Sequence, residues 1–232
     1  MLQIKQLRYH IDNLGYLVYG NRYAMAVDGG AHGDILSFIK SCGLNLLYVA
    51  NTHQHADHTS GNGALLHESN ARLLLYEEIQ NAEIELEGRK IRVYSTPGHT
   101  ADSICFHVEN TLITGDTLFN GTVGNCFSGD MKGFYHSIKK IMSLSENTVI
   151  YAGHDYVEEA MNFARRLEPD NEYIEIFLRN YRPDHVYSRL TEELRVNPYL
   201  RFNERSIIDL LKRKRLPVKT EWQRWQSLMT ID

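Results

Sequence analysis

Four side chains that can bind metal ions lie within the six residues from His53 to His58. They are His53, His55, Asp57 and His58. Imidazole nitrogens and carboxylate oxygens suit zinc, iron and manganese. On an extended loop, the side chains of residues two apart can bind one cation, while the side chains of their neighbours bind a second. The segment therefore favours a site for two metal ions, with a polar loop of incidental histidines as the alternative.

Three more candidate ligands lie farther along the chain and disfavour that alternative. His99 stands at the tip of a Pro-Gly turn, and Asp116 and His154 each follow an apolar, strand-like run. An aspartate at a strand end can bridge two cations with its two oxygens, although Asp116 taken alone would more simply be a turn residue. Active sites of layered α/β folds lie at the carboxyl ends of strands, so we expect these side chains to meet the histidine-rich segment.

The order and spacing of these motifs resemble the metallo-β-lactamase superfamily. The chain carries H-x-H-x-D-H, then P-G-H-T, G-D-T-L-F and G-H-D-Y. The resemblance implies two divalent metal ions, with zinc expected and iron or manganese as alternatives. It implies two ligand groups and one bridging residue: His53, His55 and His99; Asp57, His58 and His154; and Asp116.

The last third of the chain resembles the helical tail of glyoxalase II, the hydroxyacylglutathione hydrolases. The similar stretches are residues 162–169 and 191–201, and residues 12–18 near the start are similar as well. This resemblance implies an α/β protein: a four-layer αββα sandwich at residues 1–167, which holds the catalytic site, and a helical substrate-binding tail at residues 168–232.

The activity that the resemblance implies is hydrolysis of an acyl-thiol, such as S-lactoylglutathione, by a hydroxide that bridges the two metals. Two cations lower the pKa of a shared water from about 15.7 toward roughly 7, which supplies this nucleophile at neutral pH. Asp57 and Asp116 are the expected catalytic residues, since Asp57 would also orient the hydroxide. Thr52 or Thr117 would fix the orientation of a ligand.

The sequence differs from the glyoxalase II pattern at the positions that contact the substrate. Glyoxalase II holds glutathione with a lysine and a tyrosine in a G-K-F-Y stretch, and Asn125 and Phe127 occupy those positions here. Tyr156 matches the tyrosine that contacts the substrate after the last histidine. We expect a small-molecule acyl-thiol substrate in an altered pocket, with the carrier thiol left open. The basic run at residues 212–215 is expected to be a solvated helix face, or alternatively to hold an anionic substrate.

Two other activities remain open on the same scaffold. A persulfide dioxygenase binds one iron through positions that match His53, His99 and Asp116, and the glyoxalase-like tail disfavours it. A lactone or other ester hydrolase is the second alternative. A non-enzymatic binding protein is disfavoured because all seven ligand positions are filled.

Composition agrees with an ordinary globular protein of 232 residues. The formal net charge of −4 argues against a nucleic-acid-binding surface, which needs a concentrated positive field. No run approaches membrane-spanning length, so we expect a cytoplasmic protein without a membrane partner. Cys42, Cys105 and Cys126 lack C-x-x-C spacing and favour a reducing compartment. The oligomeric state and any role of Cys126 stay open.

Periodicity predicts strands in the first part of the chain and helices in the last. The strands of a first sheet are expected at residues 2–9, 14–19, 23–27 and 46–50, and those of a second sheet at 71–76, 83–87, 89–95 and 103–108. Helices are expected at residues 33–41, 64–68, 131–144, 157–167, 173–179 and 203–215. Two sheets with helices on both outer faces is the natural packing.

Overall fold

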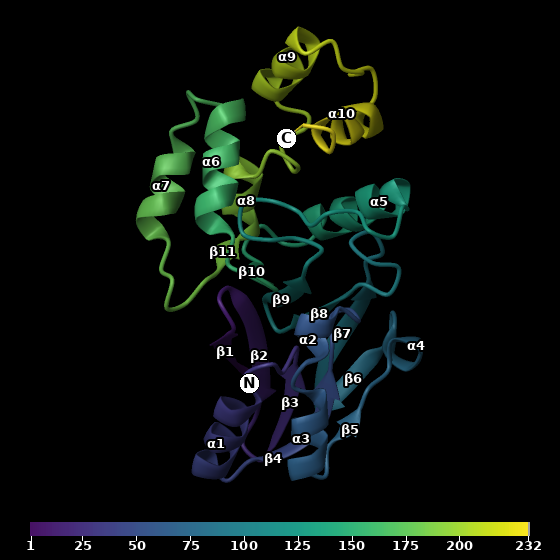
Figure 1. Ribbon diagram of the computed structural model, residues 1–232, viewed down its shortest axis with the longest axis vertical. Helices are drawn as coiled ribbons and strands as arrows, with labels where there is room; N and C mark the ends of the chain where they lie inside the picture. The colour runs from purple at the N-terminus through teal and green to yellow at the C-terminus, as the bar shows by residue number, and fades with distance from the viewer. Residues whose placement is uncertain (232) are drawn as a thin grey trace.

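Two β-sheets lie face to face in the computed structural model, which describes residues 1–231 of the chain (Figure 1). The strand orders are β1-β2-β3-β4-β5 in the first sheet and β11-β10-β9-β8-β7-β6 in the second. The strands are β1 (Gln3–Tyr9), β2 (Asn13–Tyr19), β3 (Tyr23–Val27), β4 (Asn45–Ala50), β5 (Arg72–Leu73), β6 (Glu83–Leu86), β7 (Arg89–Ser95), β8 (Ile104–Val108), β9 (Thr111–Gly115), β10 (Val149–Ala152) and β11 (Ser188–Arg189).

Helices cover both outer faces of this pair of sheets and form the tail (Figure 1). They are α1 (His32–Cys42), α2 (Ala56–Thr59), α3 (Asn62–Glu68), α4 (Tyr76–Ile79), α5 (Met131–Met142), α6 (Val157–Leu167), α7 (Tyr173–Asn180), α8 (Leu190–Val196), α9 (Arg205–Arg213) and α10 (Glu221–Leu228). Within residues 1–231, none of these helices combines the length and the apolar character needed to cross a membrane.

Three buried clusters show which faces the layers share. Tyr16 of β2 and Phe106 of β8 are fully buried in the cluster between the two sheets. Ile35 of α1 is buried in a second cluster, against the outer face of the first sheet. Phe134 of α5 is buried in a third, with Leu112 of the second sheet. Alternate strand residues point to opposite faces, so each sheet can bury both sides. The predicted αββα architecture is confirmed.

The predicted strand at residues 71–76 is wrong in both length and sheet. Only Arg72–Leu73 form a strand, and this strand, β5, pairs in parallel with β4 at the edge of the first sheet. Tyr76 already begins α4. A parallel pair needs a crossover between its strands, and α3 lies in the connection that joins β4 to β5. An apolar run of this length does not reveal which sheet it joins.

The helical tail is fastened to the sandwich by polar contacts. The side-chain amide of Gln6 in β1 donates to the Val186 carbonyl (2.7 Å) and accepts from the Val186 amide (2.8 Å), as a neighbouring strand would. Within the tail, the Glu168 carboxylate accepts from Arg201 Nε at 2.7 Å and is 5% exposed. The tail therefore packs on the sandwich instead of hanging from its end.

Candidate metal centre

The loop after β4 carries four of the predicted ligands, and its backbone changes from an extended segment to a helical turn within them. His53 and His55 lie on the extended part of the loop, and His55 is the N-cap of the single-turn helix α2. The His58 amide donates to the His55 carbonyl at 3.1 Å, which closes this turn. Asp57 and His58 are thereby directed to a different position from His53 and His55. The local geometry explains how one short segment can serve two centres.

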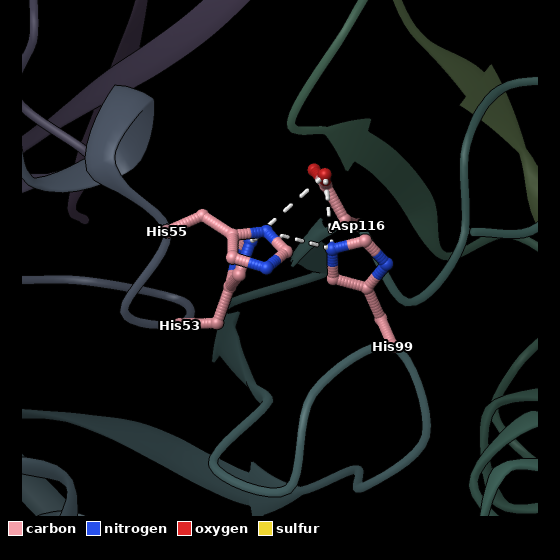
Figure 2. A group of neighbouring side chains, drawn as sticks. All are labelled: His53, His55, His99 and Asp116. Atoms are coloured by element: carbon pink, nitrogen blue, oxygen red, sulfur yellow. Dashed lines mark hydrogen bonds and ion pairs between the residues drawn. The ribbon is translucent and has the colours of Figure 1, made fainter. Parts of the chain in front are cut away.

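The first group joins this loop to two others and consists of His53, His55, His99 and Asp116. His55 Nδ1 lies 2.8 Å from His53 Nε2 and 3.1 Å from His99 Nε2. Figure 2 shows the three rings pointing toward one another, with the Asp116 carboxylate at their side. His53 and His99 are buried, at 2% and 4% exposure, so water competes little for these nitrogens.

The second group consists of Asp57, His58 and His154. His154 Nε2 lies 3.2 Å from His58 Nε2 and 3.3 Å from Asp57 Oδ2. The candidate ligand atoms of each group lie within 4.8 Å of one another. The structure thus brings all seven predicted side chains together in the two groups that the family pattern implies.

Asp116 lies between the two groups. Its Oδ2 is 3.5 Å from His99 Nε2 in the first group and 3.5 Å from His154 Nε2 in the second, and its Oδ1 is 3.3 Å from His58 Nε2. A Cβ on Gly153 would lie 2.2 Å from Asp116 Oδ1, so this position requires glycine. Burial opposes ionisation of Asp116, but the adjacent charge of His58 outweighs it and lowers the pKa of Asp116 to about 2.

Four of the five histidines have their other ring nitrogen held by a neighbouring oxygen. The pairs are His53 Nδ1 with Thr52 Oγ1 (3.1 Å), His58 Nδ1 with Asp28 Oδ2 (2.9 Å), His99 Nδ1 with the Asn125 carbonyl (3.0 Å) and His154 Nδ1 with Asp12 Oδ1 (3.0 Å). An acceptor on the outer nitrogen holds a proton there, so the inward nitrogen is the one that can offer a lone pair to a cation. This is the arrangement that a bound cation requires. Burial opposes the charge of His58, but the Asp28 and Asp116 carboxylates outweigh it and raise the pKa of His58 to about 11, so a cation would displace the inward proton of this ring.

Sequence reasoning missed both of the carboxylates among these supporting groups, Asp28 and Asp12. Asp28 is fully buried and also accepts a hydrogen bond from the Thr52 amide (2.8 Å). Asp12 is followed in the sequence by Asn13, whose side-chain amide donates to Asp57 Oδ2 (2.8 Å). Asp28 directly follows β3, and Asp12 ends the turn between β1 and β2, positions shared by many structural aspartates. Thr52 does contact His53, whereas the Thr117 hydroxyl lies 3.1 Å from the Thr96 hydroxyl instead.

The residues present fit two divalent cations. One carboxylate oxygen, Asp116 Oδ1, is buried and accepts no hydrogen bond from the described part of the chain. Burial, together with the charge of His58, lowers the pKa of His53 to about 4, so its imidazole is neutral at pH 7 and can act as a ligand. The nitrogen and oxygen donors match the preferences of zinc, iron and manganese.

The three predicted substrate contacts flank this centre. The Tyr156 ring stacks on His154, with centroids 5.0 Å apart, and Phe127 lies 5.2 Å from the His99 ring with 66% of its surface exposed. The Asn125 side chain is exposed while its carbonyl holds His99.

The basic run at residues 212–215 is exposed and ends α9. Lys212 pairs with Asp209 of the same helix at 3.6 Å. Figure 1 shows α9 well above α2, which carries Asp57 and His58, so the structure does not bring this run to the metal centre.

Comparisons with known proteins agree with this geometry. A family model described as metallo-β-lactamase superfamily matches residues 13–95 and 76–154, and one described as hydroxyacylglutathione hydrolase C-terminus matches residues 155–229. A hydroxyacylglutathione hydrolase from Vibrio cholerae is 32% identical over 226 residues, which cover 90% of this chain and 90% of the relative.

Solved structures share the fold at lower identity. ETHE1 from Myxococcus xanthus is similar with a TM-score of 0.67 at 22% identity, over 97% of this chain and 99% of that one. BLEG-1, a B3 metallo-β-lactamase, gives 0.65 at 19% identity, over 85% and 99% of the two chains. The family models and the close relative together show that the chain belongs to the hydroxyacylglutathione hydrolase (glyoxalase II) family of the metallo-β-lactamase superfamily, a family of metal-dependent hydrolases.

Proposed function

We propose that this chain hydrolyses a thioester at a dinuclear metal centre, with S-lactoylglutathione or a related acyl-thiol as substrate. The observation that carries the proposal is the position of Asp116, within 3.5 Å of imidazole nitrogens from both ligand groups. A single-metal site would need only the first group. His53, His55 and His99 would hold one metal and Asp57, His58 and His154 the other, with Asp116 shared between them.

Two bound cations would lower the pKa of a shared water toward about 7 and stabilise the oxyanion of the attacked carbonyl. The chain's own groups orient the reactants. Asn13 Nδ2 holds Asp57 Oδ2 at 2.8 Å, and the Asp57 side chain is 37% exposed, so this carboxylate can direct the attacking water. Burial and nearby carboxylates raise the pKa of Tyr156 to about 12, so its hydroxyl keeps its proton and can donate to the substrate. A thiolate can leave without protonation.

The proposed pocket keeps one family contact and has lost two. Tyr156 remains beside His154, whereas Asn125 and Phe127 replace a cation and a hydroxyl. The exposed Phe127 ring, beside the His99 ring, offers an apolar surface to the substrate. We propose that residues 1–167 hold the chemistry and that the tail at residues 168–232 supports substrate binding.

Competing substrates of matched acyl group test the proposal. The kcat/KM for S-lactoylglutathione should exceed that for the matching oxygen ester and for a homoserine lactone, because the thiolate is the better leaving group. The comparison uses metal-quantified protein with thiol release or acid release as the readout. The opposite ranking would identify a lactone or ester hydrolase. Dioxygen consumption with a persulfide, by protein with one bound iron, would identify a dioxygenase.

A further inference from the structure

A short hairpin directly after Asp116 reaches from the metal centre into the helical tail. It comprises residues 117–123 and is called the Asp116 hairpin below. Leu118 and Val123 form an isolated bridge, and the Phe119 amide donates to the Thr122 carbonyl at 2.9 Å. Phe119 and Asn120 are 5% and 1% exposed. A buried turn must find partners for its backbone polar groups outside itself.

Glu193 of α8 supplies the main partner at the tip of the hairpin. The Gly121 amide lies 3.0 Å from each carboxylate oxygen of Glu193, which is fully buried. Ser188 Oγ and Asn197 Nδ2 donate to the same carboxylate at 2.7 and 2.9 Å. Three residues thus direct donors at one buried carboxylate, which offsets part of the cost of burying its charge.

Further contacts hold the rest of the turn against the tail. Asn197 Nδ2 also donates to the Thr122 carbonyl at 3.1 Å, and Asn120 Nδ2 donates to Ser188 Oγ at 2.7 Å. Gly121 has a φ of +98°, and a Cβ there would lie 2.4 Å from Met161 Cε of α6. The tip of the hairpin is therefore enclosed by α6, α8 and β11, and the positive φ disfavours any other residue at position 121.

The same hairpin places an aromatic ring against the metal centre. Phe119 meets the His154 ring edge to face at 6.0 Å and the Tyr156 ring at 5.1 Å. His154 and Tyr156 stack on each other with an interplanar angle of 6°. His154 belongs to the second ligand group, so a shift of Phe119 would change the support of that group before it affected the first.

We propose that Glu193 is a positioning residue of the metal centre, which holds the Asp116 hairpin through Gly121 so that Phe119 supports His154 and Tyr156. The tail would thereby help to build the second metal site in addition to its proposed contact with substrate. The inference rests on the proposed function where the second metal and turnover are concerned. A buried charge is costly unless it is fully paired, and here its pairing extends to the reactive side of the molecule.

The test uses Glu193→Gln at pH 8, above the pKa of Glu193, which burial raises to about 7. In this variant, a neutral side-chain amide would replace the carboxylate that now accepts hydrogen bonds from Gly121, Ser188 and Asn197. Because hydrogen bonds to charged groups contribute strongly, exchange of the Gly121 amide should accelerate on the order of tenfold. The affinity for the second metal equivalent should fall on the order of tenfold, with the first much less affected. In metal-free protein, the His154 ring resonances should shift.

Two further variants separate positioning from loss of tail stability. Glu168→Gln makes the same change in another buried tail carboxylate, whose partners are Arg201 and Ser206, and should leave the second metal and the His154 resonances as in the wild type. Phe119→Leu should reproduce the weaker second metal and the shifted His154 resonances while the Gly121 amide stays protected. It also provides the test if Glu193→Gln does not fold.

Two outcomes would overturn the inference. In the first, Glu193→Gln exposes the Gly121 amide but leaves second-metal affinity and the His154 resonances unchanged, which reduces Glu193 to an attachment of the tail. In the second, Glu168→Gln weakens the second metal as much as Glu193→Gln does. If the wild type turns over no thioester, or binds a single metal, the proposed function fails. The exchange and His154 measurements on metal-free protein would still decide the role of Glu193.

Discussion

Replacement of Asp116 by alanine should abolish binding of both metals and lower kcat/KM for the thioester by at least about a thousandfold, or about 4 kcal/mol of transition-state stabilisation. The reason is geometric, because the Asp116 carboxylate lies within 3.5 Å of His99 and His154, one from each ligand group. The substitution removes an anionic ligand that both groups share. Elemental analysis of metal-replete protein, alongside steady-state kinetics, measures both effects.

Asp130→Ala is the matched control for this substitution. Asp130 is exposed at the N-cap of α5, where its Oδ1 accepts from the Gly133 amide at 2.8 Å. Its removal should cost about 1 kcal/mol of stability and leave metal content unchanged. The bridging role of Asp116 would be wrong if Asp116→Ala kept two equivalents of metal and near-normal turnover.

The second large effect is a gain of affinity in the double variant Asn125→Lys, Phe127→Tyr. A charged hydrogen bond to a carboxylate contributes about 1.5–3 kcal/mol, so KM for a glutathione thioester should fall roughly ten- to a hundredfold. Both side chains are exposed, and the Asn125 contact with His99 is made by its backbone, so the metal centre should be unaffected. An interaction that binds ground state and transition state equally leaves kcat nearly unchanged.

Asn125→Met with Phe127→Tyr controls for side-chain length, since methionine extends to a similar reach without the charge. This control should recover little of the affinity if the missing cation is the cause. The argument fails if the wild type already binds glutathione thioesters tightly and the double variant is no better. Tyr156 or the basic run at residues 212–215 would then have to supply the contact.

The sequence predicts most of the fold because its signals are local. The strand at residues 23–27 and the helix at residues 157–167 have their predicted limits, since apolar periodicity marks both. The strand at residues 71–76 was misplaced because a short apolar run does not specify its pairing partner. The side chains that meet at the centre were foreseeable because each lies in a short motif at the end of a strand.

The supporting contacts could not be foreseen in the same way. The contact of Glu193 with Gly121 spans 72 residues, and that of His154 with Asp12 spans 142. Nothing in the run Thr191-Glu192-Glu193-Leu194 distinguishes the buried glutamate from its neighbour, Glu192, which closes the first turn of α8. Only the packing of the tail on the hairpin separates the two. Long-range polar partners of this kind are specified by tertiary structure.

The most direct test of a dinuclear thioesterase is to measure thiol release from S-lactoylglutathione while Zn²⁺ is added to metal-free protein. Turnover should stay low after the first equivalent and reach its maximum as the second binds, because both ligand groups are needed to activate the water and stabilise the products. Maximal turnover with one equivalent bound, or no thiol release with two, would contradict the account.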